Sequence, residues 1–373
     1  MIASGGSDGF VKRMAMAFVA ASLLACEDSA LDDCAPGLDS CAGTCVDTRI
    51  DWSHCGACGR ACGEGIGCFG GVCTSPQPMS IPRSGHGVVV GPDERIWALG
   101  DSGMPSPTGA SEAYDPSTNH WTPLPALLEK RRDVLVAVNL RGAVHAIGGQ
   151  RLNVPLDTVE RLDVSAETWT NSAKLTSPRG APAVAVGRDE KIYAAWGYSE
   201  LVGEPTIVPT LDVFDGLKWT AEPAPPPEVI PRFGAVAVGA EDGSILFLGG
   251  CKTGAALGMT AVDAYHPDTK TWEPLPALNF PRCAAAAVVA PDGRVFCFGG
   301  RDASGQESAA VELYDPAEKE KGWQSAASMP EPRAYMGAVA AGDGRIYVVG
   351  GWVYPNSLET TLVYDPATDR WAW

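Results

Sequence analysis

The chain has 373 residues, of which 45% are hydrophobic and 8% aromatic, so it contains ample material for a large core. Its 43 glycines and 30 prolines are typical of a turn-rich all-β fold. A net charge of −17 argues against binding nucleic acid or an anionic membrane through a general electrostatic field.

The N-terminus has the features of an export signal. Lys12 and Arg13 precede the apolar run Met14–Leu24, which is too short to span a bilayer. The run leads into Leu23-Leu24-Ala25-Cys26, which resembles the lipobox of a bacterial lipoprotein signal. An ordinary secretory signal cut nearby, or an uncleaved anchor, is the alternative.

The resemblance to a lipoprotein signal implies where the protein is located. In that family the lipobox cysteine receives diacylglycerol and becomes the mature N-terminus. We therefore expect residues 1–25 to be a signal peptide, Cys26 to be lipidated and residues 26–33 to form a tether. The protein would be exported to the bacterial outer membrane, periplasm or cell surface, and would touch a membrane only through its lipid.

Residues 34–73 hold eight cysteines in a short, glycine-rich segment. An even number in an exported protein predicts four disulfides with 105 possible pairings, and a segment this small needs such bonds to fold. The cysteines are Cys34, Cys41, Cys45, Cys55, Cys58, Cys62, Cys68 and Cys73. The segment is similar to the cysteine-rich module of the stigma-specific protein type. The alternative is a zinc site, because Cys55-x-x-Cys58 has a zinc-ligand spacing and His54 adjoins it.

After a linker over residues 74–80, a repeat of about 50 residues begins and runs to residue 373, which is close to the period of a propeller blade. Each unit opens with an arginine, usually after proline, and six such arginines predict six blades. The opening arginines are Arg83, Arg132, Arg179, Arg232, Arg282 and Arg333. The predicted blades span about 81–130, 131–177, 178–230, 231–280, 281–331 and 332–373.

Each unit then has a glycine pair or a degenerate version of it, an aromatic-Asp-Pro turn or its variant, and a tryptophan. In the sixth unit these are Gly350-Gly351, Tyr364-Asp365-Pro366 and Trp371. This pattern resembles the kelch repeat, which implies four short strands per blade. The fold class we predict is an all-β, six-bladed kelch-type propeller preceded by a small disulfide-rich segment. Because Pro76–Arg83 is similar to the connectors between blades, we expect the first and last blades to close by side-by-side packing.

Three cysteines fall within the predicted propeller. Cys251 follows the glycine pair of the fourth unit, and Cys283 follows the arginine that opens the fifth. Both positions lie at the same end of an antiparallel blade, so we predict a Cys251–Cys283 disulfide between neighbouring blades. Cys297 would then be a buried free thiol.

If the blades are related by rotation, the six opening arginines converge around the central opening. Guanidinium groups bind carboxylates bidentately, so one interpretation is a site for an acidic peptide or sugar. The other is architectural, with the arginines bonded to carbonyl groups of neighbouring loops. Residues that break the symmetry are the candidates for specificity: Tyr198, Arg301 and Trp352.

Two functional classes follow. Kelch propellers are most often interaction platforms, which implies a module that binds a protein or glycan at the bacterial cell envelope. The alternative is a carbohydrate-active enzyme of the periplasmic sialic-acid epimerase type, for which no catalytic residue is identified. A galactose-oxidase-type copper site is disfavoured because none of the five histidines is paired with a second ligand. We expect no metal and no cofactor.

Overall fold

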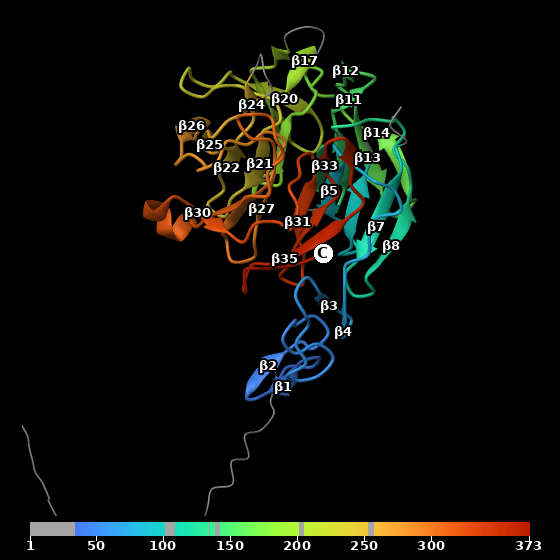
Figure 1. The fold of residues 1–373 in the computed structure, drawn as a ribbon. Helices are drawn as coiled ribbons and strands as arrows, with labels where there is room; N and C mark the ends of the chain where they lie inside the picture. Colours follow the sequence, from blue (N-terminus) through green and yellow to red (C-terminus); the bar gives the residue numbers. More distant parts are fainter. Residues whose placement is uncertain (1–33, 101–108, 134, 139–141, 201–204, 253–256) are drawn as a thin grey trace, which may run out of the picture.

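A computed structural model describes residues 34–100, 109–133, 135–138, 142–200, 205–252 and 257–373 (Figure 1). The predicted lipidation site Cys26 and the tether 26–33 lie outside these ranges. Within them, no helix is long and apolar enough to cross a membrane.

The described residues form six four-stranded antiparallel sheets, each built from strands of one repeat. The all-β, six-bladed propeller predicted from the repeats is therefore confirmed. The first three blades are β5 (Gly87–Val90), β6 (Ile96–Leu99), β7 (Ser111–Asp115) and β8 (His120–Leu124); β9 (Leu135–Val138), β10 (Val144–Ile147), β13 (Val159–Asp163) and β14 (Thr168–Asn171); and β15 (Ala183–Val186), β16 (Ile192–Ala195), β19 (Leu211–Phe214) and β20 (Trp219–Glu222).

The other three blades follow the same order. They are β21 (Val236–Gly239), β22 (Ile245–Leu248), β25 (Val262–His266) and β26 (Thr271–Pro274); β27 (Ala286–Val289), β28 (Val295–Phe298), β29 (Val311–Tyr314) and β30 (Trp323–Ala326), with the 3-10 helix η1 (Pro316–Lys321); and β31 (Gly337–Ala340), β32 (Ile346–Val349), β35 (Thr361–Asp365) and β36 (Arg370–Ala372).

Four blades carry a short two-stranded ribbon between their second and third long strands. The ribbons are β11 (Gln150–Arg151) with β12 (Val154–Pro155), β17 (Tyr198–Glu200) with β18 (Thr206–Ile207), β23 (Cys251–Lys252) with β24 (Leu257–Gly258), and β33 (Trp352–Val353) with β34 (Asn356–Ser357).

The first strands of the blades form an inner ring. β5, β9, β15, β21, β27 and β31 each contact the first strand of the blades on both sides. Just before each of these strands one residue has a positive φ between 45° and 62°. These residues are Gly85, Asp133, Ala181, Gly234, Ala284 and Tyr335. Because alanine, aspartate and tyrosine rarely adopt this conformation, the neighbouring backbone must hold it.

Backbone hydrogen bonds join these positions from blade to blade. The amides of Gly234, Ala284 and Tyr335 donate to the carbonyls of Ala181, Gly234 and Ala284, at 3.0, 2.8 and 2.9 Å. The amide of Gly85 donates to the carbonyl of Tyr335 at 2.8 Å, which carries the same bond across from the last blade to the first. With β31 beside β5 and no strand exchanged in the described sheets, the blades close side by side.

The cysteine-rich module, residues 34–73, has two small ribbons: β1 (Asp39–Cys41) with β2 (Thr44–Val46), and β3 (Gly67–Phe69) with β4 (Val72–Thr74). Four disulfides hold it together: Cys34–Cys45, Cys41–Cys58, Cys55–Cys68 and Cys62–Cys73. The sulfur atoms of the zinc alternative are therefore used in disulfides. His54 beside them accepts a hydrogen bond from the amide of Gly59 at 3.0 Å through its Nδ1.

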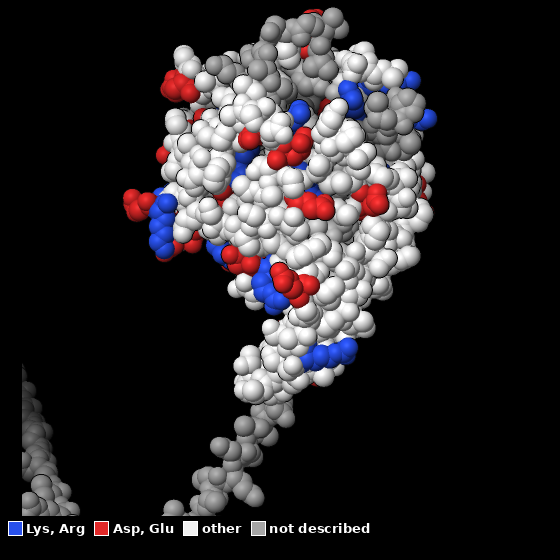
Figure 2. Space-filling model, viewed as in Figure 1, with Lys and Arg blue, Asp and Glu red and all other residues white. Residues whose placement is uncertain are grey.

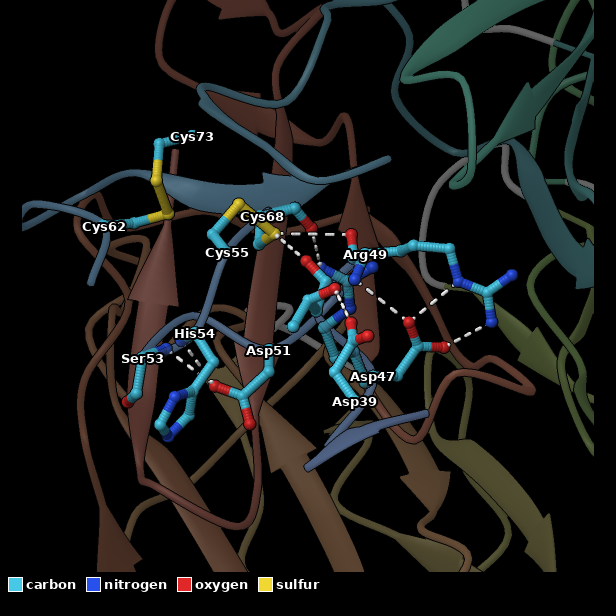
Figure 3. Close-up of a disulfide and its surroundings, with 12 residues drawn as sticks. Asp39, Asp47, Arg49, Asp51, Ser53, His54, Cys55, Cys62, Cys68 and Cys73 are labelled. Carbon is cyan, nitrogen blue, oxygen red and sulfur yellow. Dashed lines mark hydrogen bonds and ion pairs between the residues drawn. A yellow bond between two sulfur atoms is a disulfide. The ribbon is translucent and has the colours of Figure 1, made fainter. Parts of the chain in front are cut away.

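The module's polar side chains hold its own loops. Figure 3 shows Arg49 paired with Asp47, the amides of Ser53 and His54 on the carboxylate of Asp51, and Cys68 beside the backbone of the same loop. On the propeller face seen in Figure 2, acidic and basic side chains are interspersed instead of gathered by sign.

Candidate functional site

Five of the six predicted arginines do not point into the central opening. Arg83, Arg179, Arg232, Arg282 and Arg333 are at most 1% exposed. Each lies inside its blade and donates to the backbone carbonyl of the first glycine of the pair, or of Trp196 in the third blade. The structure therefore supports the architectural interpretation for these five and corrects the expectation of a ligand-facing ring.

In the second blade the buried arginine is Arg131, not Arg132. Arg131 is fully buried, donates to the carbonyl of Gly148 at 2.9 Å and pairs with Glu160 at 2.7 Å. Arg132 instead lines the central pocket, and its guanidinium donates to the side chain of Asn153. The sequence has two adjacent arginines at this position, and the course of the backbone buries the first and places the second in the pocket lining.

A buried carboxylate on the third strand faces the buried arginine in every blade but the last, where the exposed Glu331 lies 3.6 Å from Arg333. The third-strand acids, which the sequence analysis missed, are Glu112, Glu160, Asp212, Asp263 and Glu312. Each lies two residues before the aromatic or leucine residue of the turn motif, and that recurring spacing could have identified them. In the sixth blade Leu362 takes this position, and burial lowers the pKa of Arg333 to about 10.

A pocket of about 910 Å³ lies at the centre of the ring, over the inner strands. All six blades contribute residues to its lining, and the positive-φ residues Gly85, Asp133, Ala181, Gly234, Ala284 and Tyr335 are among them. Its volume is within the range of pockets that hold small ligands or inserted side chains.

Two buried side chains of the pocket lining carry polar atoms that have no hydrogen-bond partner within the described part of the chain. Gln150 is 3% exposed, and its Oε1 has no hydrogen-bond partner, whereas its Nε2 donates to Asp133. His86 is 5% exposed, and neither of its ring nitrogens has a partner. Burial, together with the charge of Arg83, lowers the pKa of His86 to about 3, so its neutral ring presents one acceptor and one donor. Burial raises the pKa of Asp133, although the hydrogen bond from Gln150 opposes this shift.

Aromatic rings form much of the remaining wall. Tyr198 and Phe233 meet edge to face with centroids 5.6 Å apart. Tyr335 and Trp352 line the pocket from the sixth blade. Tyr198 and Trp352, predicted from broken symmetry, are thus in the site. Arg301 is not among the lining residues: it donates to the carbonyl of Gly305 at 3.0 Å and lies 3.7 Å from Glu307.

The structure joins Cys251 to Cys283, with Cα atoms 5.0 Å apart, in the pocket wall between the fourth and fifth blades. Cys297 is a free and buried cysteine. The predicted Cys251–Cys283 disulfide therefore forms part of the pocket wall.

The ribbons that begin in the pocket wall extend outward with apolar side chains exposed. Leu152 and Val154 on the first ribbon are 69% and 61% exposed, Leu257 on the third is 37% exposed, and Tyr354 on the fourth is 78% exposed. Exposed apolar groups around a pocket are typical of a surface that binds another molecule.

Known proteins carry the same signatures. A kelch motif matches residues 282–330 and 333–372, and the stigma-specific STIG1-like protein family matches residues 18–76. Mouse kelch-like protein 23 is 26% identical over 272 residues, covering 71% of this chain and 45% of that protein. Alpha-scruin of Limulus polyphemus is 33% identical over 129 residues, covering 32% of this chain and 14% of that protein.

The solved structure of YjhT superposes with a TM-score of 0.66 at 14% identity, covering 79% of this chain and 98% of that one. This likeness concerns the fold. The chain spans less than half the length of these two curated relatives. It combines kelch motifs on a six-bladed propeller with a STIG1-like cysteine-rich region.

Proposed function

We propose that this protein is an exported, lipid-anchored binding module of the bacterial cell envelope that holds its partner at the central pocket. The pocket carries the proposal, because it combines unused polar atoms, aromatic walls and a collar of exposed apolar residues in one place. The lipobox at Cys26 and the disulfide-rich module support the location outside the cytoplasm.

The pocket chemistry favours a partner group that carries hydrogen-bond donors. The Oε1 of Gln150 and a ring nitrogen of His86 are buried acceptors without a partner among the described residues, and a hydroxyl or amino group that reaches them would complete them. An acidic partner, the expectation from six converging arginines, would find Arg132 alone of those six in the pocket lining.

Hydroxyl groups occur on protein side chains and on glycans alike, and the surroundings of the pocket favour a protein. Leu152, Val154 and Tyr354 offer apolar contact area beyond the reach of one sugar ring, as protein interfaces do at their centre. We therefore propose a protein segment that inserts a donor-bearing side chain into the pocket, with the ribbons against its flanks.

In-cell photo-crosslinking from position 354 tests this proposal. A photoreactive residue at Tyr354 is expected to yield a protein adduct, and Trp352→Ala is expected to abolish it by removing an aromatic wall. The matched control position is Leu217, which is 86% exposed in the turn between β19 and β20 and outside the pocket lining. A glycosidase-sensitive adduct would assign the site to a glycan, and equal labelling from Tyr354 and Leu217 would overturn the proposed binding face.

The location is tested separately. Cys26→Ala is expected to move the protein from the membrane fraction to the soluble fraction, because the lipid is its proposed attachment. Retention in the membrane fraction without the cysteine would contradict the lipoprotein assignment.

No observation favours the sialic-acid epimerase alternative or a copper enzyme. An acidic sugar needs a cationic clamp, and five of the six predicted arginines are buried and bonded inside their blades. His145, in the second strand of its blade, is buried and packs edge-on against Phe214, away from the pocket lining.

A further inference from the structure

The junction between the last and first blades differs from the other five. Elsewhere the outer strand of one blade runs into a connector that leads to the inner strand of the next. At three of these junctions the connector also accepts a hydrogen bond from a tryptophan on the outer strand of the following blade: Trp169 donates to Pro125, Trp323 to Pro276 and Trp371 to Ala327. Because β5 is the first strand of the ring and β36 the last, no connector can run from one to the other.

Residues that follow the cysteine-rich module occupy the connector's place at this junction. The indole of Trp121 donates to the carbonyl of Gln77 at 3.0 Å, as its counterparts do in other blades. The amide of Met79 donates to Glu359 of the sixth blade at 2.8 Å, and that of Ser80 to Glu112 of the first at 2.9 Å. This segment therefore touches both sides of the seam, and its upstream end is the module.

The module itself binds the outer part of the sixth blade. Gly65 forms a parallel bridge with Ala372 and accepts the amide of Trp373 at 3.0 Å. Arg345 of the sixth blade donates to the carbonyl of Cys68 at 3.1 Å, and its guanidinium lies 5.0 Å from the ring centroid of Phe69. Figure 1 shows the blue module next to β35 and the C-terminal end of the chain.

The module and the two seam blades also share one apolar core. Trp52, Cys55, Cys68 and Phe69 of the module pack in the same buried cluster as Tyr114 of the first blade and Tyr347 of the sixth. The members named here are at most 5% exposed. A flexible spacer between a lipid and a propeller would not need to bury residues against both blades, so this cluster distinguishes a docked module from a tether.

We infer that the cysteine-rich module is a clasp, which holds the first and last blades together by non-covalent contacts where the ring lacks a covalent connector. Its disulfides keep residues 65–70 in the shape that meets the seam, and Cys55–Cys68 is the bridge nearest to the Arg345 contact. This inference does not depend on the identity of the partner.

The clasp has a consequence for the pocket. His86 comes from the first blade, and Tyr335 and Trp352 come from the sixth, so the pocket wall crosses the seam. Loss of the Cys55–Cys68 bridge would loosen the seam and thereby change the spacing of these residues. The disulfides of the module thus support the geometry of the pocket as well as that of the seam.

Two paired-cysteine variants of the full chain test the clasp. Cys55→Ser with Cys68→Ser removes the bridge at the seam, and Cys34→Ser with Cys45→Ser removes one whose cysteines are not in the shared core. In the first variant, amide exchange in β5 and β36 is expected to accelerate at least roughly tenfold while β25 and β26 keep their rates, because opening is local. Unchanged exchange at β5 and β36 in both variants would show that the module is a spacer.

A cleavage experiment keeps the clasp testable if the first variant fails to fold. A specific protease site inserted between Thr74 and Ser75 of the wild-type sequence separates the module from the propeller after folding. If the module is a clasp, the cleaved module is expected to co-elute with the propeller on gel filtration. The module of cleaved Arg345→Ala protein is expected to dissociate faster. Complete separation of the cleaved wild-type protein would overturn the inference.

Discussion

Each blade contributes one buried arginine and at least one residue of the central pocket. The buried arginines are the same in all blades, whereas the pocket residues differ. The arginine inside each blade repeats with its glycine-pair carbonyl and, in five blades, with its carboxylate. The pocket residues differ from blade to blade, from glycine and alanine to Asp133 and Tyr335 at equivalent positions. Identity across repeats therefore identifies what builds the ring, and departure from identity identifies the site.

Arg131 and Arg132 show this contrast in adjacent residues. Arg131 is fully buried between Gly148 and Glu160, whereas Arg132 faces the pocket. The same contrast occurs within the ring: Arg282 faces the buried Glu312, but Arg333 has no third-strand carboxylate. Substitutions at these arginines therefore distinguish residues that stabilise the fold from residues that contribute to binding.

The largest expected effect is the loss of a buried pair. Arg282→Met leaves Glu312, which is 0% exposed, without its counter-charge and is expected to destabilise the propeller by about 3–5 kcal/mol. Arg333→Met leaves no buried carboxylate behind and is expected to cost less. Chemical denaturation of both variants measures the difference, and Arg282→Met with Glu312→Leu should recover part of the loss. Equal losses for the two single variants would contradict the distinction between the blades.

A buried histidine outside the pocket predicts acid sensitivity. Burial lowers the pKa of His145 to about 4, below its ordinary value of 6.5, and neither ring nitrogen has a partner. Its neutral form is favoured in the folded state, so stability is full above pH 6.5 and falls as the pH drops toward 4. The loss from this residue is about 2–3 kcal/mol.

His145→Leu is expected to flatten that part of the stability profile. The measurement is the free energy of unfolding at pH 7 and pH 4.5 for both proteins. The control Leu217→Ala changes an exposed side chain that does not titrate, and it should leave the profile unchanged. An identical loss in wild type and His145→Leu would contradict the assignment.

The smallest expected effect on stability comes from the pocket arginine. Arg132→Ala removes a guanidinium that donates to Asn153 at an exposed position, and it is expected to change the free energy of unfolding by less than about 0.5 kcal/mol. Binding measured by the crosslink from Tyr354 should nevertheless fall if the partner contacts that side of the pocket. A loss of stability comparable to that of Arg282→Met would place Arg132 with the architectural residues.

Much of the fold could be predicted from local signals. The repeat of arginine, glycine pair, turn and tryptophan predicted six four-stranded blades, and the placement of Cys251 and Cys283 at one end of adjacent blades predicted their bridge. Tyr198 and Trp352, which were singled out because they break the repeat, line the pocket, and their role in binding stays a prediction. The wrong choice between Arg131 and Arg132 arose because both satisfy the spacing, and only the course of the backbone to Asp133 separates them.

Other parts of the site depended on contacts that no spacing encodes. The acceptors of Gln150 and His86 are significant because none of the described residues pairs with them. The contact of the module with Arg345 and Trp373 joins residues from nearly opposite ends of the chain. Such long-range contacts form only when the ring closes, so the pattern within a single repeat does not predict them.

The sequence by itself determined the number and class of the blades, because each blade is a local unit whose strands and turns are written within about 50 residues. Only the tertiary structure decided which way the arginines point, because a guanidinium is drawn to whichever carbonyls and carboxylates the closed blade brings to it. It also decided that the disulfide-rich module docks on the seam, because that contact exists only once the first and last blades have met.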